Sequence, residues 1–123
     1  MTKTKRDMVA GAARRHPDST ILDARKIANN TLAYRVPESG TSFIALHDTD
    51  VLAWGDHGVV AVDTGGYNTV TTRARLNEFG GRLGVRVRTA KGVLHVNGVP
   101  CHRRAWVYPD GKVKTDMNDM GLA

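Results

Sequence analysis

Residues 43–63, FIALHDTDVLAWGDHGVVAVD, hold three short apolar runs separated by polar turns. The runs are Phe43 to Leu46, Val51 to Trp54 and Val59 to Asp63, and Asp, Gly and His residues fill most of the intervals. Apolar runs at a spacing of about eight residues, with turn chemistry between them, are typical of an antiparallel meander. We therefore predict three neighbouring strands in the middle of the chain.

The segment before this meander predicts helix and then extended chain. Residues 1–16 combine helix formers with five cationic side chains, which favours a short basic helix or a disordered arm that ends at Pro17. Asp18-Ser19-Thr20 can cap a second short helix over residues 21–25. Residues 31–36 are rich in strand-forming residues, and the following Pro-Glu-Ser-Gly sequence predicts a turn.

The segment after the meander predicts one helix and further strands. Thr71 or Thr72 can cap a helix that continues to Phe79, and Gly80-Gly81 ends it. The strands expected beyond it are Val85 to Arg88, Val93 to Asn97 and Arg104 to Tyr108. The expected fold class is α+β, a small antiparallel sheet with one packed helix at about residues 71–79.

The length of 123 residues suits one compact domain, which we expect to span residues 17–114. The basic helix or arm of residues 1–16 precedes it, and a flexible tail of residues 115–123 follows it. The single cysteine, Cys101, excludes an internal disulfide framework, and no apolar run is long enough for a membrane span. We expect a cytoplasmic protein that neither enters a membrane nor needs a cofactor.

Charge is segregated along the chain. Net charges are +5 for residues 1–35, −5 for residues 36–72, +8 for residues 73–114 and −2 for the tail. Separate basic and acidic blocks suit the attraction of a charged partner. The acidic block can also pack against the basic blocks of its own chain, or it can promote homo-oligomers.

Alternation in the basic block predicts a surface for nucleic acid. Arg86 and Arg88 share one strand face, and Arg104, Trp106 and Tyr108 share a face of another strand. If the two faces coincide, guanidinium groups can meet phosphates while bases stack on the aromatic rings. Arg103 belongs to the same region, and Lys3, Lys5, Arg6, Arg14 and Arg15 add non-specific attraction. In the alternative interpretation the two aromatic rings are core and the arginines are a solvated face.

The predicted helix carries Arg73 and Arg75 in its first turns, where the helix dipole disfavours cations. A phosphate bound at this end would meet backbone N–H groups, threonine hydroxyls and both guanidinium groups. Alternatively, these arginines are tolerated surface residues. The predicted nucleic-acid site is therefore Arg73, Arg75, Arg86, Arg88, Arg103, Arg104, Trp106 and Tyr108.

Two features of the sequence could carry catalytic chemistry, and each has a simpler structural role. Asp63-Thr64-Gly65 follows an apolar run, as in retroviral-type aspartic proteases, so an enzyme would be a homodimer with Asp63 at its axis. The simpler role of this motif is a turn after a strand, and no catalytic residue is predicted. Cys101 is expected to be an inert, partly buried thiol.

Metal ligands are available but lack a recognised spacing. One candidate set combines His47, Asp48, Asp50 and His57, and the other combines His95, Cys101 and His102. Asp48 and Asp50 are more simply turn residues, and His95 and His102 are more simply surface or nucleic-acid contacts. We therefore expect no metal site.

The middle of the chain, about residues 26–79, resembles a family of small proteins encoded by phages of high-GC actinobacteria. The resemblance rests on Lys26-Ile27-Ala28-Asn29-Asn30-Thr31 with Tyr34, on Leu46-His47-Asp48-Thr49-Asp50-Val51, and on Gly65-Gly66-Tyr67-Asn68-Thr69-Val70-Thr71-Thr72-Arg73. The family has no assigned activity, so the resemblance implies a phage origin and a host-cytoplasm setting, and no site residue. The function we expect is non-catalytic nucleic-acid binding. The alternative is an inhibitor or modulator of a host protein, including a defence system.

Overall fold

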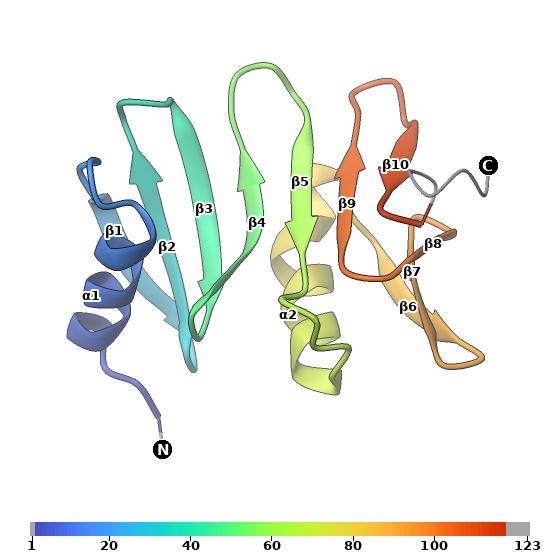
Figure 1. The fold of residues 1–123 in the computed structure, drawn as a ribbon, viewed down its shortest axis with the longest axis horizontal. Helices are drawn as coiled ribbons and strands as arrows, with labels where there is room; N and C mark the ends of the chain where they lie inside the picture. Colours follow the sequence, from blue (N-terminus) through green and yellow to red (C-terminus); the bar gives the residue numbers. More distant parts are fainter. Residues whose placement is uncertain (1, 118–123) are drawn as a thin grey trace.

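In the computed structural model, which describes residues 2–117, two antiparallel sheets pack together and a helix lies on each face of the larger one (Figure 1). The larger sheet has the strand order β1-β2-β3-β4-β5-β9-β10. Its strands are β1 (Leu22–Ala28), β2 (Thr31–Val36), β3 (Thr41–Leu46), β4 (Thr49–Trp54), β5 (Val60–Asp63), β9 (Arg104–Val107) and β10 (Val113–Thr115). The smaller sheet contains β6 (Val87–Ala90), β7 (Val93–Val96) and β8 (Val99–Cys101).

The α+β class and the central meander are confirmed. Strands β3, β4 and β5 pair in sequence, and β2 has the bounds predicted for extended chain. Strand β4 has a bulge at Val51, next to the pair that Leu52 forms with Ile44. Val51 and Leu52 therefore both point into the same core. Two adjacent apolar side chains can therefore be buried without ending the strand.

Helix α1 (Lys5–Arg15) is ordered and packs on what we call the outer face of the larger sheet. Its Thr4 cap accepts a hydrogen bond from the Asp7 amide at 3.1 Å, and Asp7 accepts one from the Thr4 amide at 3.4 Å. This capping box explains where the helix begins. Met8 and Ala12 are buried against Leu32 and neighbouring side chains of the sheet, so the amino-terminal segment belongs to the folded domain.

The predicted helix over residues 21–25 is wrong, because residues 22–25 begin strand β1. The Thr20 hydroxyl, whose oxygen would cap such a helix, instead donates to the Glu38 carboxylate at 2.7 Å, and the Thr20 amide donates to the same carboxylate at 3.0 Å. Asp23 also has a positive φ of 55°. The backbone of β1 is satisfied by pairing with β2, so the local capping signal is overridden.

Helix α2 (Val70–Gly80) confirms the predicted packed helix, although its cap is Thr69 rather than Thr71 or Thr72. The Thr69 hydroxyl accepts a hydrogen bond from the Thr72 amide at 3.1 Å. Leu76 is fully buried under the helix, on the inner face of the larger sheet. A short 3-10 turn, η1 (Gly81–Leu83), follows α2 and ends at Gly84, whose φ is 82°.

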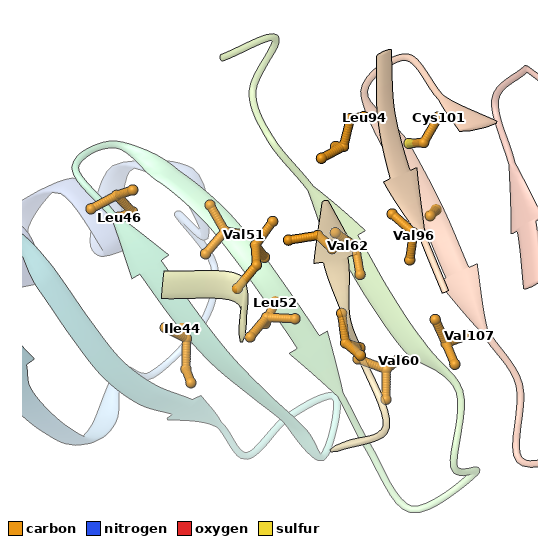
Figure 2. Packing of buried hydrophobic residues seen from close by; sticks show 14 residues of the cluster. Ile44, Leu46, Val51, Leu52, Val60, Val62, Leu94, Val96, Cys101 and Val107 are labelled. Atoms are coloured by element: carbon orange, nitrogen blue, oxygen red, sulfur yellow. The ribbon is translucent and has the colours of Figure 1, made fainter. Parts of the chain in front are cut away.

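The main core lies between the inner face and the elements that cover it. Figure 2 shows Val60, Val62, Val96 and Val107 packed together between the two sheets. The smaller sheet therefore covers the β5–β9 side of the inner face, while α2 covers β3 and β4. Burial of these apolar side chains is the principal stabilisation of the fold.

The carboxyl end is more structured than predicted. Sequence reasoning missed β8 and β10, which are three residues each and too short for a periodic signal. Thr115, expected to begin a flexible tail, is fully buried in β10. The Asp116 carboxylate accepts backbone hydrogen bonds from residues 102–104 at 2.7–3.1 Å. The rest of the predicted tail, residues 118–123, lies outside the described residues.

Candidate nucleic-acid interface

The acidic block uses several of its carboxylates to bind basic residues of the same chain. Asp48 pairs with Lys3 at 2.9 Å, and Asp50 pairs with Arg15 at 2.9 Å. Asp63 pairs with two arginines of the carboxyl-terminal basic block. Part of the basic charge counted in the sequence is therefore neutralised within the fold.

Asp63 lies at the end of β5, beside the start of β9. Its carboxylate accepts hydrogen bonds from Arg103 Nε at 2.9 Å and from the Gly65 amide at 2.8 Å, and Arg104 Nε lies 3.4 Å away. Partial burial opposes ionisation, but these hydrogen bonds and positive charges outweigh it and lower the pKa of Asp63. An aspartate held ionised in this way suits a structural ion pair better than the proton-sharing pair of an aspartic protease.

The two strand faces that were expected to form one basic and aromatic surface point in opposite directions. Val87 of β6 and Val107 of β9 both enter the core between the sheets, so Arg88 and Trp106, one residue away, face outward from different sheets. The premise that the faces coincide is wrong. Arg104 and Trp106 remain neighbours on the outer face, with Arg104 beside Asp63 and Tyr108 exposed beyond the strand.

The two arginines of α2 contact acceptors within the protein. Arg73 Nη1 donates to the Asn68 carbonyl and side-chain oxygens at 3.0 and 2.7 Å. Arg75 Nε donates to the Thr31 hydroxyl at 3.0 Å, which joins α2 to β2. A structural role within the fold therefore accounts for both residues.

A groove that the sequence did not predict lies between strands β1–β3 and the carboxyl end of α2 with η1. Its volume is about 600 Å³, within the range of roughly 300–1,000 Å³ that holds small molecules in proteins. The apolar part of its lining includes Ile27, Ala33, Phe43, Ile44, Trp54, Phe79 and Leu83. Three arginines also line it, so we call it the arginine groove: Arg25 from β1, Arg35 from β2 and Arg82 from η1.

The position of Arg35 follows from the period of β2. Leu32 and Tyr34 point to the α1 side, so Ala33 and Arg35 share the inner face. Arg25 is the cross-strand partner of Ala33, which brings the two arginines to the same part of the sheet. All three groove arginines are exposed, and none has an ion pair within residues 2–117.

Two carboxylates, Asp23 and Glu78, line the same groove. Neither lies within ion-pair distance of a basic group in the described part of the chain. The groove thus offers separated positive and negative groups around an apolar, aromatic floor. Arrangements of this kind suit a ligand that combines a planar ring with anionic groups.

A second hollow of about 820 Å³ lies at the amino end of α2. Its lining is mostly hydroxyl and amide groups, and its one arginine, Arg75, already donates to Thr31. It therefore lacks the combination of unpaired cations and aromatic rings that distinguishes the arginine groove.

A polar cluster around Asp50 attaches α1 to the larger sheet. Arg15 donates twice to the Asp50 carboxylate, the Tyr34 hydroxyl donates at 2.5 Å, and His16 Nε2 lies 3.0 Å away. The rings of Tyr34 and Phe43 stack with centroids 5.1 Å apart. Burial and the hydrogen bond to Asp50 raise the pKa of Tyr34 well above its usual range, so the phenol stays protonated.

The remaining candidate chemistry has ordinary structural roles. Burial, together with the nearby Asp116 carboxylate, raises the pKa of Cys101 to about 12, which disfavours the reactive thiolate. Over residues 2–117, no group of three or more His, Cys, Asp or Glu side chains could hold a metal ion. Asp48 and Asp50 of the first candidate set instead form the ion pairs described above.

Comparison with known proteins gives a family but no activity. No curated protein and no solved structure matches the chain. No helix among the described residues is long and apolar enough to cross a membrane. Residues 1–116 match the phage family described as Kyanoviridae Gp96 protein, so the expected phage origin is confirmed, while the assignment to phages of actinobacteria is not supported. The chain therefore belongs to the Kyanoviridae Gp96 protein family.

Proposed function

We propose that this phage protein binds nucleic acid without catalysis and that the arginine groove is its principal contact. The proposal rests mainly on one observation. Arg25, Arg35 and Arg82 come from three separate elements, converge on one groove and have no ion pair among the described residues. Guanidinium groups without counterions, beside aromatic rings, are the groups that bind phosphates and stack on bases.

The ion pairs of the acidic block strengthen this choice of site. Arg103 and Arg104 have their charge partly balanced by Asp63, whereas the groove arginines keep theirs. Two exposed arginines, Arg86 just before β6 and Arg88 within it, lack aromatic neighbours in the smaller sheet, whose strands contain no Phe, Trp or Tyr. They remain candidates for weaker, non-specific attraction.

The test is fluorescence anisotropy of labelled single-stranded and duplex DNA and RNA with nuclease-treated protein over a salt series. The groove variant carries Arg25→Ala, Arg35→Ala and Arg82→Ala. The control variant carries Arg6→Ala, Arg86→Ala and Arg88→Ala, which remove the same charge from exposed positions outside the groove. Because the two variants have equal net charge, a difference in binding between them reports the groove itself rather than general electrostatic attraction.

We expect binding by the wild type that weakens steeply with salt. The groove variant should reduce the slope of log K against log salt by about 2, because each phosphate contact contributes about 0.7 for a single strand. The control variant should change the slope by less than half of that amount. Equal effects of the two variants would contradict the groove as the site, and absence of binding at low salt would contradict the function.

Binding to a host protein is the second candidate, and a separate observation favours it. Tyr67 and Val70 at the start of α2 are 66% and 74% exposed. Exposed aromatic and aliphatic side chains are typical anchors in protein interfaces. This function predicts capture of a host partner after nuclease treatment that Tyr67→Ala with Val70→Ala abolishes and the groove variant does not.

A further inference from the structure

We infer that the arginine groove receives one unstacked base of a single strand and prefers a base with an exocyclic amino group. This inference rests on the proposed nucleic-acid binding and goes further, because it names the form of the ligand and the part that enters the groove. It follows from three features of the groove, namely its aromatic floor, its arginines and its carboxylates.

The floor determines which part of the nucleic acid can enter. Trp54 and Phe79 are partly buried in the lining, and both pack against the main core. Their rings are therefore held in place and still accessible from the groove. A base face is the part of a nucleic acid that gains by contact with such rings. Bases inside a duplex are stacked on one another, so a single strand is the form that can supply one.

The arginines determine where the backbone of the strand would lie. Arg25 and Arg35 come from the β1–β2 side of the groove, and Arg82 comes from the η1 side. Phosphates on either side of an inserted base can therefore meet guanidinium groups on both sides of the groove. A strand that crosses the groove satisfies this arrangement, whereas an isolated apolar ligand leaves the three charges unused.

The carboxylates determine which bases fit best. Asp23 and Glu78 are acceptors in the same lining, and neither is taken up by an ion pair within the described chain. Carboxylates accept hydrogen bonds from exocyclic amino groups such as the N4 amine of cytosine. Thymine and uracil present carbonyl oxygens at that position, which a carboxylate repels.

The first test uses Trp54 as the reporter. The chain has two tryptophans, so Trp106→Phe leaves Trp54 alone, and Trp106 lies on the opposite face of the larger sheet from the groove. A cytosine homo-oligomer should quench Trp54 emission, and an abasic strand of the same length should not. The abasic strand should also bind at least about fivefold more weakly, the lower limit for the stacking of one base.

The second test compares cytosine and thymine homo-oligomers, whose rings have the same size. Cytosine should bind at least about fivefold more tightly, as expected for a hydrogen bond that discriminates between bases. Glu78→Gln should erase or reverse this preference, because an amide can also donate to the thymine carbonyl. Glu78 is exposed, so the variant is expected to fold.

The outcomes separate the inference from the proposed function. Equal binding of abasic and base-containing strands, with constant Trp54 emission, would refute the base-binding role and leave nucleic-acid binding intact. Binding of thymine that equals or exceeds that of cytosine would refute the role of the carboxylates. Failure of every strand to bind would refute both proposals.

Discussion

Replacing Asp50 with alanine should release α1 from the larger sheet and destabilise the fold by about 3–5 kcal/mol, the cost of leaving one partner of a mostly buried ion pair alone. The Asp50 and Arg15 side chains are only 16% and 20% exposed. The same carboxylate also accepts the Tyr34 hydroxyl at 2.5 Å. Arg15 Nη1 is already buried without a hydrogen-bond partner among residues 2–117.

The assay is urea unfolding followed by circular dichroism. With a slope of about 1–3 kcal/mol per molar urea, a loss of about 4 kcal/mol lowers the midpoint by more than about 1 M. The matched control is Asp56→Ala in the β4–β5 turn, whose carboxylate makes no hydrogen bond or ion pair with the described residues. Such a surface change should stay within about 0.5 kcal/mol.

A double variant tests whether the cost arises from the unpaired guanidinium. Arg15→Met combined with Asp50→Leu should lose less stability than the sum of the two single changes, because neither charge is then left buried alone. Equal midpoints for Asp50→Ala and Asp56→Ala would refute the claim that this cluster holds α1. Strict additivity in the double variant would refute the ion pair as the cause.

Two further predictions concern Cys101 and the end of α2. Because the pKa of Cys101 is raised to about 12, the thiol contributes stability that is fully present below the unfolded pKa of about 8.5 and is lost as pH rises toward 12. Between pH 8.5 and 10 the urea midpoint of the wild type should fall more steeply than that of Cys101→Ala, and parallel curves would exclude the thiol as the cause. A Cβ at Gly80 would lie 2.9 Å from Val85 Cβ, so Gly80→Ala should destabilise by about 1–3 kcal/mol. At the neighbouring Gly81 nothing lies within 4 Å of a Cβ, so Gly81→Ala should stabilise by up to about 1 kcal/mol. A thermal melt in which Gly80→Ala stabilises the protein, or Gly81→Ala destabilises it, would contradict this packing.

Sequence reasoning succeeded where local pattern and tertiary packing agree. The three runs in residues 43–63 became β3, β4 and β5, and the segment before Gly80-Gly81 became α2. It failed at residues 21–25, where a capping signal favoured helix. There the Thr20 hydroxyl binds Glu38, a residue 18 positions away, and no local pattern contains that contact.

The site was harder to predict than the fold because it depends on contacts between distant residues. The sequence predicts Arg103 and Arg104 as free cations, whereas in the fold Asp63, 40 positions before Arg103, lies beside both. Local pattern predicts Arg25 in a helix and Arg35 in a separate extended segment, so it does not place them together. Only the pairing of β1 with β2 and the position of η1 bring them together with Arg82.

The arginine groove is a consequence of how wide the larger sheet is. Its seven strands are separated by six intervals of about 4.8 Å, so the sheet spans about 29 Å. Helix α2 is about 10 Å across and covers β3 and β4. The smaller sheet has two intervals of about 4.8 Å, so it covers a similar width over β5, β9 and β10. Roughly two strands of the inner face remain without a covering element. These are β1 and β2, which carry Arg25 and Arg35 there, so the uncovered part of the sheet adds cations to the apolar floor of the groove.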